Sequence, residues 1–430
     1  MALKRVVVTG IGMVSPLGLS AQESWEALLK GQSGIINIED YLERLKQTDS
    51  QNKLINPKLW PGNTYVAPIK VGFGNLKKWK VPLCTNNANS YVMSAAVEAL
   101  KDSKIEKILQ ENEDLQNQAG VNIGIMSSNT TKLTEIIKDT EKKGFDGLNR
   151  LTIFHTLTNM ASANLSIKYK LKGPSQSAST ACATGSSAIG DSFRNIQFGD
   201  AKVMLAGGSE ECLNPTIIWA SIRMQAMNQK IHEKPEYSSR PFDIQRSGFI
   251  LGEGAGVLVL EEMEHAVQRG AFIYAEIGGY GQSSDGYHLS RPLESGNGGL
   301  RCMKKAIEQA GVGLGEIQSI NCHATSTQTG DLAEGLAICQ LLERFQGKCV
   351  ITANKGNIGH TFGAAGAIES IFSLLSIRDG VVPKILNLQE ECQKGLRFAR
   401  ENVVGNVDVV VKNSFGFGGV NVSLVFKKFK

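Results

Sequence analysis

One cysteine of the chain stands in a long stretch of small residues. Cys182 lies within STACATGSSAIG, which has no large side chain before Ile189. Small side chains allow a helix to be buried against other backbone. A cysteine in the first turn of such a helix gains thiolate stability from the helix dipole and the unpaired N–H groups. The stretch by itself fits a nucleophilic cysteine and a packing cysteine of a core helix equally well.

Three further loops each carry a reactive or flexible feature. His323 is followed by a hydroxyl-rich loop in NCHATSTQTGD, where a structural histidine is the simpler interpretation of the loop alone. Lys355 and His360 stand five residues apart in ANKGNIGHTFGAAGAIES, whose glycines allow the backbone to come close. A glycine-rich turn with two aromatic residues follows in NSFGFGGVN. Packing alone does not account for four such loops, which together indicate a functional site.

Zinc binding and proteolysis are both disfavoured for this set. The adjacent residues Cys322 and His323 cannot easily chelate one ion in tetrahedral geometry with Cys182 and His360, and no paired ligand spacing is present. A cysteine protease needs one histidine and an orienting Asn or Asp. That arrangement would leave the second histidine and Lys355 without a role.

Two glycine motifs do not fit dinucleotide binding. In TGIGMVSPLG the third glycine of a dinucleotide fingerprint would fall at Ser15, and Pro16 follows it. The second motif, GEGAG at 252–256, precedes its strand and does not follow it. We therefore expect structural turns at both places.

The composition indicates a globular protein of ordinary charge. The chain has 430 residues, of which 46 are glycine, about 11% against a usual value of about 7%. Its length fits two to three domains or one large duplicated fold.

The net charge of +5 is too weak to indicate nucleic-acid binding, and no apolar run approaches a membrane span. The N-terminus shows no secretory signal. The eight cysteines form no CxxC pair, so we expect a reducing compartment.

Short β-branched runs alternate with helical stretches, which predicts an α/β fold with covered sheets. Strands are expected at Val6–Thr9, Val121–Met126, Lys202–Ala206, Ala255–Leu260, Ser319–Asn321, Val407–Val411 and Val422–Phe426. Helices are expected at Ala21–Leu29, Tyr91–Leu100, Met160–Tyr169, Leu300–Ala310, Leu332–Leu342 and Gly363–Ser376. The polar stretch 46–80 is expected to be an irregular surface excursion.

At these motifs the chain resembles the β-ketoacyl-acyl carrier protein synthases of the elongating type, which are thiolase-like condensing enzymes. The resemblance runs nearly end to end, and its specific parts are GPSQSASTACATGSSAIGD, RPFDIQRSGFILGEGAGVLVLE, CHATSTQTGD, NKGNIGHTFGAAGAIES and NSFGFGGVN. It implies a five-layered αβαβα fold of two similar halves, here residues 1–262 with the cysteine and 263–430 with the histidines, the lysine and the glycine-rich loop. It also implies a homodimer.

The resemblance implies a role for each motif residue. Cys182 is expected to be the nucleophile, His323 and His360 the catalytic histidines, and Lys355 the nearby lysine. Phe417 matches the gating phenylalanine, whose backbone N–H joins that of Cys182 as the oxyanion hole. The remaining matches are the threonines that hold the phosphopantetheine arm, a second pocket aromatic, and the acidic partners behind the site: Thr325, Thr327, Phe415, Asp331 and Glu369.

Metal, cofactor and partner expectations follow from the same resemblance. No catalytic metal or other cofactor is expected, although Glu369 is associated in the family with a structural monovalent cation, to which Asn413 could contribute. The partner is acyl carrier protein, in its acyl and malonyl forms. The basic residues expected to dock it are Lys77, Lys78, Lys80 and Arg223, for which a solvated surface cluster remains an alternative.

The sequence departs from the family pattern at a few positions. Ala324 replaces a common glycine, Gly356 a serine, Ser247 an aspartate and Val420 a threonine. A glycine-rich turn is replaced by SSNTT at 127–131, which leaves the preferred acyl-chain length open. None of these changes touches the cysteine and the two histidines.

The predicted function is decarboxylative condensation of an acyl-enzyme with malonyl-acyl carrier protein in fatty acid elongation. A polyketide-type ketosynthase shares every motif, and a non-catalytic partner resembling a chain-length factor would usually lack Cys182. A thiolase would use a second late cysteine, and a starter-unit synthase an asparagine in place of His360. The segments IKYKLKGP and GDSFRN are most similar to mitochondrial and α-proteobacterial members. The mitochondrial matrix is therefore expected, with the bacterial cytoplasm as the alternative.

Overall fold

A computed structural model describes residues 3–48, 55–69, 86–127, 130–148, 150–345 and 347–430. The central feature is a mixed sheet of eleven strands. One half of the sheet has the order β1-β8-β6-β4-β5, formed by Val6–Val14, Gly254–Glu262, Val203–Glu210, Ala119–Gly124 and Ser175–Gln176. The other half has the order β9-β16-β15-β10-β11-β13, formed by Ala275–Ser284, Val420–Lys427, Val409–Gly416, Ser319–Asn321, Val350–Thr352 and Arg397–Phe398.

The two halves repeat the same pairing pattern. In the first half, β1 pairs antiparallel with β8, β8 pairs antiparallel with β6, and β6 pairs parallel with β4. In the second half, β9 pairs antiparallel with β16, β16 pairs antiparallel with β15, and β15 pairs parallel with β10. The halves join where β1 and β9 run antiparallel, with Val6 opposite Ile277 and Val8 opposite Ala275. This internal repeat confirms the predicted fold of two similar halves.

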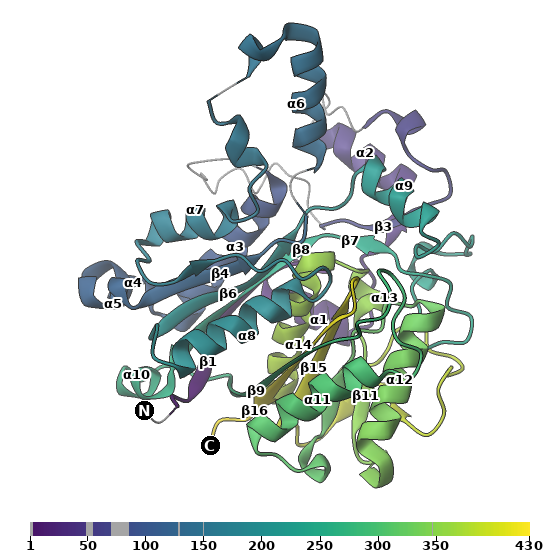
Figure 1. Cartoon of the computed structure of the whole chain (residues 1–430). Helices are drawn as coiled ribbons and strands as arrows, with labels where there is room; N and C mark the ends of the chain where they lie inside the picture. The colour runs from purple at the N-terminus through teal and green to yellow at the C-terminus, as the bar shows by residue number, and fades with distance from the viewer. Residues whose placement is uncertain (1–2, 49–54, 70–85, 128–129, 149, 346) are drawn as a thin grey trace.

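Helices cover both outer faces of the sheet and fill the space between its halves (Figure 1). On the outside, α3 (Asn87–Ser103) and α7 (Met160–Tyr169) cover the first half, and α11 (Asn297–Ala310) with α12 (Gln328–Leu342) covers the second. Between the halves lie α8 (Thr184–Gln197) and α14 (Ala365–Asp379), and α14 packs against both β8 and β15. The resulting layer order is the expected αβαβα.

Paired glycines explain how closely the outer helices approach the sheet. A Cβ on Gly12 would lie 1.9 Å from the carbonyl oxygen of Ala95 in α3, and a Cβ on Gly281 would lie 2.0 Å from that of Cys302 in α11. These distances are too short for any side chain. Gly12 lies inside β1, so the turn predicted in TGIG is wrong, and its glycines serve close packing. The turn predicted in GEGAG is also largely strand, since β8 begins at Gly254.

The remaining elements are short or lie at the edges of the molecule. The helices are α1 (Ala21–Leu29), α2 (Ile38–Thr48), α4 (Glu106–Glu111), α5 (Glu113–Asn117), α6 (Thr130–Lys143), α9 (Pro215–Arg223), α10 (Met263–Gln268) and α13 (Lys355–Ile358). The strands are β2 (Ile36–Asn37), β3 (Tyr65–Ala67), β7 (Leu251–Gly252), β12 (Val381–Val382) and β14 (Val403–Val404). The stretch expected to be irregular, 46–80, contains the end of α2 and β3 among its described residues.

Two further expectations concern the described residues only. Among them, no helix is long and apolar enough to cross a membrane. Seven cysteines are described, and all seven are free thiols. Cys84 lies outside the described residues.

Candidate active site

Cys182 lies on a tight turn that leads into the central helix α8. Ala181 has a φ of 50°, and the hydroxyl of Thr184, the first residue of α8, accepts a hydrogen bond from the N–H of Thr180 at 2.9 Å. The turn places Cys182 just before the first turn of α8, at the junction of the two halves. Its side chain is buried, with 4% of the residue exposed.

Burial outweighs the contacts that stabilise a thiolate at this sulfur. Desolvation raises the pKa of the Cys182 thiol to about 12. Lys355 and the backbone N–H groups of Phe417 and Cys182 act in the opposite direction. The expected thiolate stabilisation is therefore present but smaller than the cost of burial, and the thiol rests protonated. The same two N–H groups are those expected to form the oxyanion hole.

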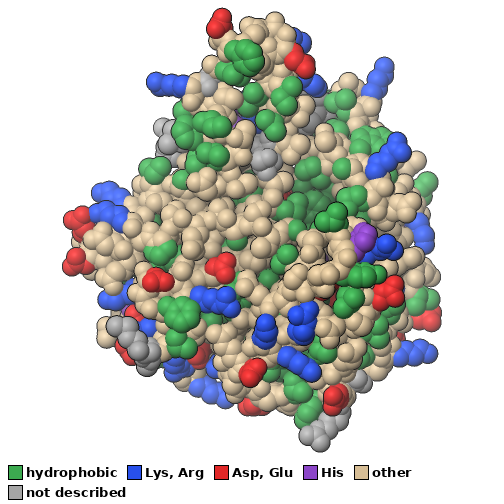
Figure 2. All heavy atoms as spheres, in the orientation of Figure 1, with side chains coloured by type: hydrophobic (Ala, Val, Ile, Leu, Met, Phe, Trp, Pro, Cys, Tyr) green, Lys and Arg blue, Asp and Glu red, His purple; other side chains and the backbone are tan. Residues whose placement is uncertain are grey.

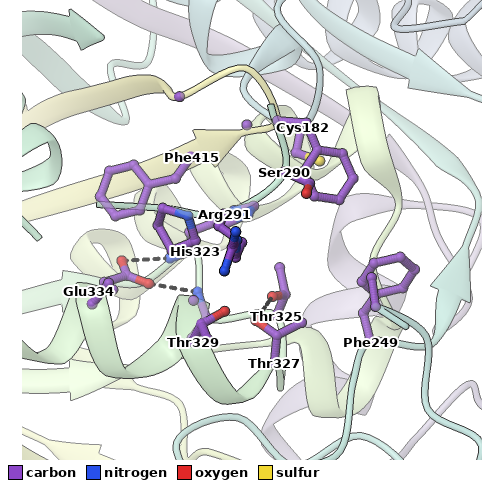
Figure 3. A pocket seen from close by; sticks show the side chains of 18 of the residues that line it. Cys182, Phe249, Ser290, Arg291, His323, Thr325, Thr327, Thr329, Glu334 and Phe415 are labelled. Carbon is purple, nitrogen blue, oxygen red and sulfur yellow. Dashed lines mark hydrogen bonds between the residues drawn. The ribbon is translucent and has the colours of Figure 1, made fainter. Parts of the chain in front are cut away.

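His323 is held at the carboxyl end of β10 by a buried glutamate. The carboxylate of Glu334 accepts hydrogen bonds from the N–H of His323 at 2.9 Å and from that of Ala324 at 2.7 Å (Figure 3). Glu334 lies on α12 and is 2% exposed. This contact fixes the backbone on which the imidazole stands.

His360 follows the short helix α13 and is held by backbone contacts. Gly359, with a φ of 63°, ends the helix. The N–H of His360 then donates to the carbonyl of Ile250 at 2.6 Å, and its carbonyl accepts from the N–H of Gly252 at 3.0 Å. The rings of Phe249 and Phe362 pack edge-on against the imidazole, with centroids 5.6 and 5.0 Å away.

The fold brings the cysteine and both histidines together. The sulfur of Cys182 and one ring nitrogen each of His323 and His360 all lie within 4.8 Å of one another. Desolvation, with the charge of Lys355 second, lowers the pKa of both imidazoles well below the usual value, so both are neutral. A metal ion could use these three atoms, but it would occupy the sulfur that a nucleophile needs.

A cavity of about 500 Å³ opens onto these residues. Its walls include the predicted substrate-binding residues, and the hydroxyls of Thr325 and Thr327 lie 3.0 Å apart on one side (Figure 3). Phe415 lies beside His323, with ring centroids 6.0 Å apart, and Phe417 also lines the cavity. The cavity is large enough for an extended thioester arm.

Lys355 and the two predicted acidic residues lie behind the cavity wall. The ammonium of Lys355 donates to the carbonyl of His323 at 2.5 Å and to the carboxylate of Glu369 at 2.6 Å. Asp331 accepts the N–H of Phe242 at 2.8 Å, and burial raises its pKa to about 7. Glu369 therefore acts on the site through Lys355, whereas Asp331 supports the loop that contains Thr325 and Thr327.

The structure describes one of the four predicted docking residues. Arg223, the last residue of α9, is exposed, and the next two residues, Met224 and Gln225, line the cavity. Lys77, Lys78 and Lys80 lie outside the described residues. Arg223 thus lies close to the mouth through which a substrate enters.

Two charged residues of this region were not predicted from the sequence. Glu334 holds the His323 backbone, and Lys412 is fully buried beside Glu369, 3.0 Å from its carboxylate. Each had a visible signal, since Glu334 interrupts an apolar helix and Lys412 interrupts the strand VVVKNS. A charge inside an otherwise buried element has to be paired.

Comparisons with known proteins agree with this geometry. A profile for the β-ketoacyl synthase N-terminal domain matches residues 3–266, and one for the C-terminal domain matches residues 274–389. A mitochondrial 3-oxoacyl-[acyl-carrier-protein] synthase of Arabidopsis thaliana is 39% identical over 98% of this chain and 93% of its own length. The chain belongs to the β-ketoacyl synthase family. As a β-ketoacyl synthase it is a condensing enzyme and an acyltransferase.

Solved structures extend the comparison to the whole β-ketoacyl synthase fold. A β-ketoacyl synthase from Burkholderia phymatum STM815 matches with a TM-score of 0.87 and 32% identity, covering 99% of this chain and 100% of the other. A ketosynthase of a type II polyketide synthase, solved in complex with its acyl-carrier protein, matches with a TM-score of 0.86 and 26% identity over the full length of both chains.

The position next to Glu369 does not fit the monovalent cation that the family resemblance suggests. The ammonium of Lys412 lies 3.0 Å from Oε2 of Glu369 and also donates to the backbone carbonyl of Asn413. The side-chain oxygen of Asn413 accepts a hydrogen bond from Ser423 at 2.8 Å. Oε2 of Glu369 accepts no hydrogen bond from the residues that the structure describes, but the ammonium of Lys412 lies 3.0 Å from it and therefore stands where a cation would bind in this synthase.

Proposed function

We propose that this β-ketoacyl synthase condenses an acyl group held on Cys182 with malonyl-acyl carrier protein in fatty acid elongation. The observation that supports this most strongly is the convergence of the Cys182 sulfur with the two neutral imidazoles inside one cavity. A nucleophile and two hydrogen-bond donors in one buried site are what acyl transfer followed by decarboxylation needs.

In the first step the sulfur of Cys182 attacks the thioester carbonyl of the acyl substrate. The carbon–sulfur bond to the carrier breaks, and the bond to Cys182 forms. The proton of the resting thiol leaves through a neighbouring imidazole to the departing carrier thiol. The N–H groups of Cys182 and Phe417, which both act on the sulfur, would hold the tetrahedral oxyanion.

In the second step the malonyl thioester enters beside the acyl group. Loss of CO2 leaves its electron pair as an enolate on the thioester, and His323 and His360 donate hydrogen bonds to the enolate oxygen. Neutral imidazoles with an N–H can do so without a proton from solvent. The carbanion carbon then attacks the acyl carbonyl, the bond to Cys182 breaks, and a 3-oxoacyl thioester leaves. The cysteine leaves this step as a thiolate and takes up one proton from solvent to return to the resting thiol.

The partner would be acyl carrier protein in its acyl and malonyl forms. The hydroxyls of Thr325 and Thr327 line the path from the mouth to Cys182 and could bind the arm that carries the thioester. Exposed Arg223 next to this mouth suits an acidic partner. The complex of the related polyketide ketosynthase with its own carrier protein supports the same mode of use.

A homodimer is the proposed assembly. Strand β5 ends the sheet, pairs only with β4 among the described strands, and exposes Ser175 and Gln176. The segment around α6, which protrudes at the top of Figure 1, has hydrophobic side chains at its surface in Figure 2. Two exposed apolar residues of this part of the chain are Phe145, 82% exposed, and Ile153, 60% exposed. An open edge beside apolar side chains is the kind of surface that pairs with a second copy. Sedimentation velocity of the purified chain tests this assembly.

The mitochondrial matrix is the proposed compartment, and the bacterial cytoplasm is the alternative. The mitochondrial relative from Arabidopsis thaliana supports the first, and the bacterial synthase from Burkholderia phymatum supports the second. Fractionation of cells of the source organism distinguishes them.

One assay tests the function as a whole. The purified protein is incubated with acyl carrier proteins of increasing chain length and with malonyl-acyl carrier protein, and the products are read by mass. A single 3-oxoacyl product two carbons longer supports fatty acid elongation. Repeated condensation without reduction indicates the polyketide-type ketosynthase instead, which the structural match to such an enzyme favours as the second candidate. If no substrate is condensed, the result indicates the non-catalytic alternative, a partner that resembles a chain-length factor.

A further inference from the structure

Two lysines share one carboxylate in the interior of the second half. Glu369 on α14 is fully buried, as are Lys355 on α13 and Lys412 on β15. The Nζ atom of Lys355 lies 2.6 Å from Oε1 of Glu369, and the Nζ atom of Lys412 lies 3.0 Å from Oε2. Each oxygen of the carboxylate therefore faces its own ammonium.

A second buried carboxylate completes the cluster. Glu334 is 2% exposed, and its Oε1 accepts a hydrogen bond at 3.2 Å from the side-chain amide of Asn413, the residue that follows Lys412. The cluster then holds two ammonium groups and two carboxylates. Opposite charges in equal number are the arrangement in which buried ions are least costly.

We propose that Lys412 takes the place of a bound monovalent cation in this chain and holds Glu369 so that Lys355 is directed at His323. The family resemblance associates Glu369 with such a cation, whereas the contacts of Glu369 and of the Asn413 carbonyl with Lys412 leave these oxygens occupied. An added cation would bring an uncompensated positive charge into a cluster that is already balanced, which is unfavourable away from water.

The positioning role follows from a chain of contacts. Lys412 holds one oxygen of Glu369, the other oxygen holds Lys355, and Lys355 donates to the carbonyl of His323 at 2.5 Å. Lys412 also contacts the hydroxyl of Ser414 at 3.3 Å, and that hydroxyl meets Ser186 of α8 at 2.8 Å. Lys412 does not line the cavity, so it acts on the site only through these contacts and is a positioning residue.

The test compares thermal unfolding in potassium, sodium and choline chloride at equal ionic strength. Wild type is expected to have the same Tm in all three salts. Lys412→Ser is expected to have a lower Tm that rises saturably with potassium or sodium but not with choline, because the lost ammonium leaves room beside Glu369. Lys427→Ser is the matched control, since Lys427 lies on the neighbouring strand β16, and its ammonium, at the protein surface, is 3.9 Å from Glu276. Its Tm should show no such cation preference.

Two results would overturn the proposal. One is a saturable rise of the wild-type Tm with potassium or sodium, and the other is a folded Lys412→Ser whose Tm is the same in the three salts. If Lys412→Ser does not fold, elemental analysis of the dialysed wild type still decides: no bound potassium or sodium supports the proposal, and one ion per chain contradicts it. None of these measurements needs condensation, so they remain valid if the proposed function fails.

A kinetic measurement tests the positioning role, which rests on the proposed function. In Lys412→Ser the decarboxylation rate should fall and recover with potassium, whereas acylation of Cys182 should change little. A fall of both rates together, without recovery in potassium, would contradict positioning through Lys355.

Discussion

The imidazole rings of His323 and His360 stand nearly perpendicular, with centroids 5.3 Å apart and an angle of 79° between their planes. The rings come from different loops, one after β10 and one after α13, and each is fixed through its backbone. Two donors at an angle to each other can reach one oxygen from two directions, as an enolate oxygen requires.

His323→Ala and His360→Ala should each lower malonyl decarboxylation by roughly 10²–10³, the usual cost of removing one such donor. Acylation of Cys182 should survive better, because its oxyanion donors are backbone N–H groups and the remaining imidazole can still relay the thiol proton. Release of CO2 from malonyl-acyl carrier protein and intact-protein mass measure the two steps separately. His265→Ala, on α10 and away from the residues that line the cavity, is the control. Wild-type decarboxylation in either variant would rule out this role.

Cys182→Ala should abolish the acyl-enzyme and condensation while the fold remains. The substitution removes only one sulfur atom from a buried turn, so Tm should change modestly. Mass spectrometry of the protein after exposure to acyl substrate measures the adduct. Cys212→Ala is the matched control, since Cys212 is also a buried thiol, and it donates a hydrogen bond to the carbonyl of Gly252 at 2.9 Å. Condensation by Cys182→Ala would contradict the nucleophile assignment.

Phe417→Ala should uncouple the order of substrate addition. Phe417 lines the cavity and is followed by two glycines with φ of 83° and 75°, so the backbone there tolerates movement of the ring. The variant should acylate Cys182 only slightly more slowly but decarboxylate malonyl thioester without an acyl partner. The rate of CO2 release without acyl substrate measures this. An unchanged rate would leave Phe417 a passive packing residue.

Arg223→Glu should raise the KM for acyl-acyl carrier protein strongly at low salt and barely affect acyl-pantetheine. The charge acts on the carrier protein and is screened by salt, whereas the small substrate makes no contact at the surface. Steady-state kinetics at two ionic strengths measure both effects. Lys107→Glu, on α4 at the opposite side of the molecule, is the control (Figure 1). Equal effects on both substrates would argue against docking at Arg223.

Glu253→Gln should flatten the dependence of stability on pH. Burial raises the pKa of Glu253 to about 8, so the folded state holds a proton that the unfolded state releases near pH 4.5. Its contribution is fully present below about pH 4.5 and is lost between about pH 4.5 and 8, at about 1.4 kcal/mol for each pH unit. Urea unfolding between pH 5 and 8 measures the slope. Glu111→Gln, at an exposed residue, should leave the slope unchanged.

Short motifs predicted the site better than they predicted its support. The small and flexible residues around Cys182, His323 and His360 indicated a functional site, and the family resemblance of these motifs gave each residue its expected role. Glu334 and Lys412 could not be named from the sequence, because their partners are distant in the chain and only the fold shows that the charges meet.

The same limit explains one incomplete expectation about local chemistry and one wrong expectation about local structure. The sequence shows that Cys182 lies near a helix start, but it does not show how completely the sulfur is removed from water, and desolvation dominates its pKa. The glycines of TGIG suggest a turn, but their role is to allow close packing of α3, a helix some 80 residues further along the chain. Both differences come from contacts between segments that local patterns do not contain.

The division of the reactive residues between the repeated halves has a consequence for folding. Cys182 belongs to the first half, and both histidines belong to the second, so neither half alone can assemble the site. A chain that has completed only one half during synthesis or refolding is therefore chemically inert towards its substrates. Recovery of condensation should lag behind recovery of helical and strand content, because it requires the ladder between β1 and β9 to close. Enzyme activity in this protein is thus a direct report on the docking of its two halves.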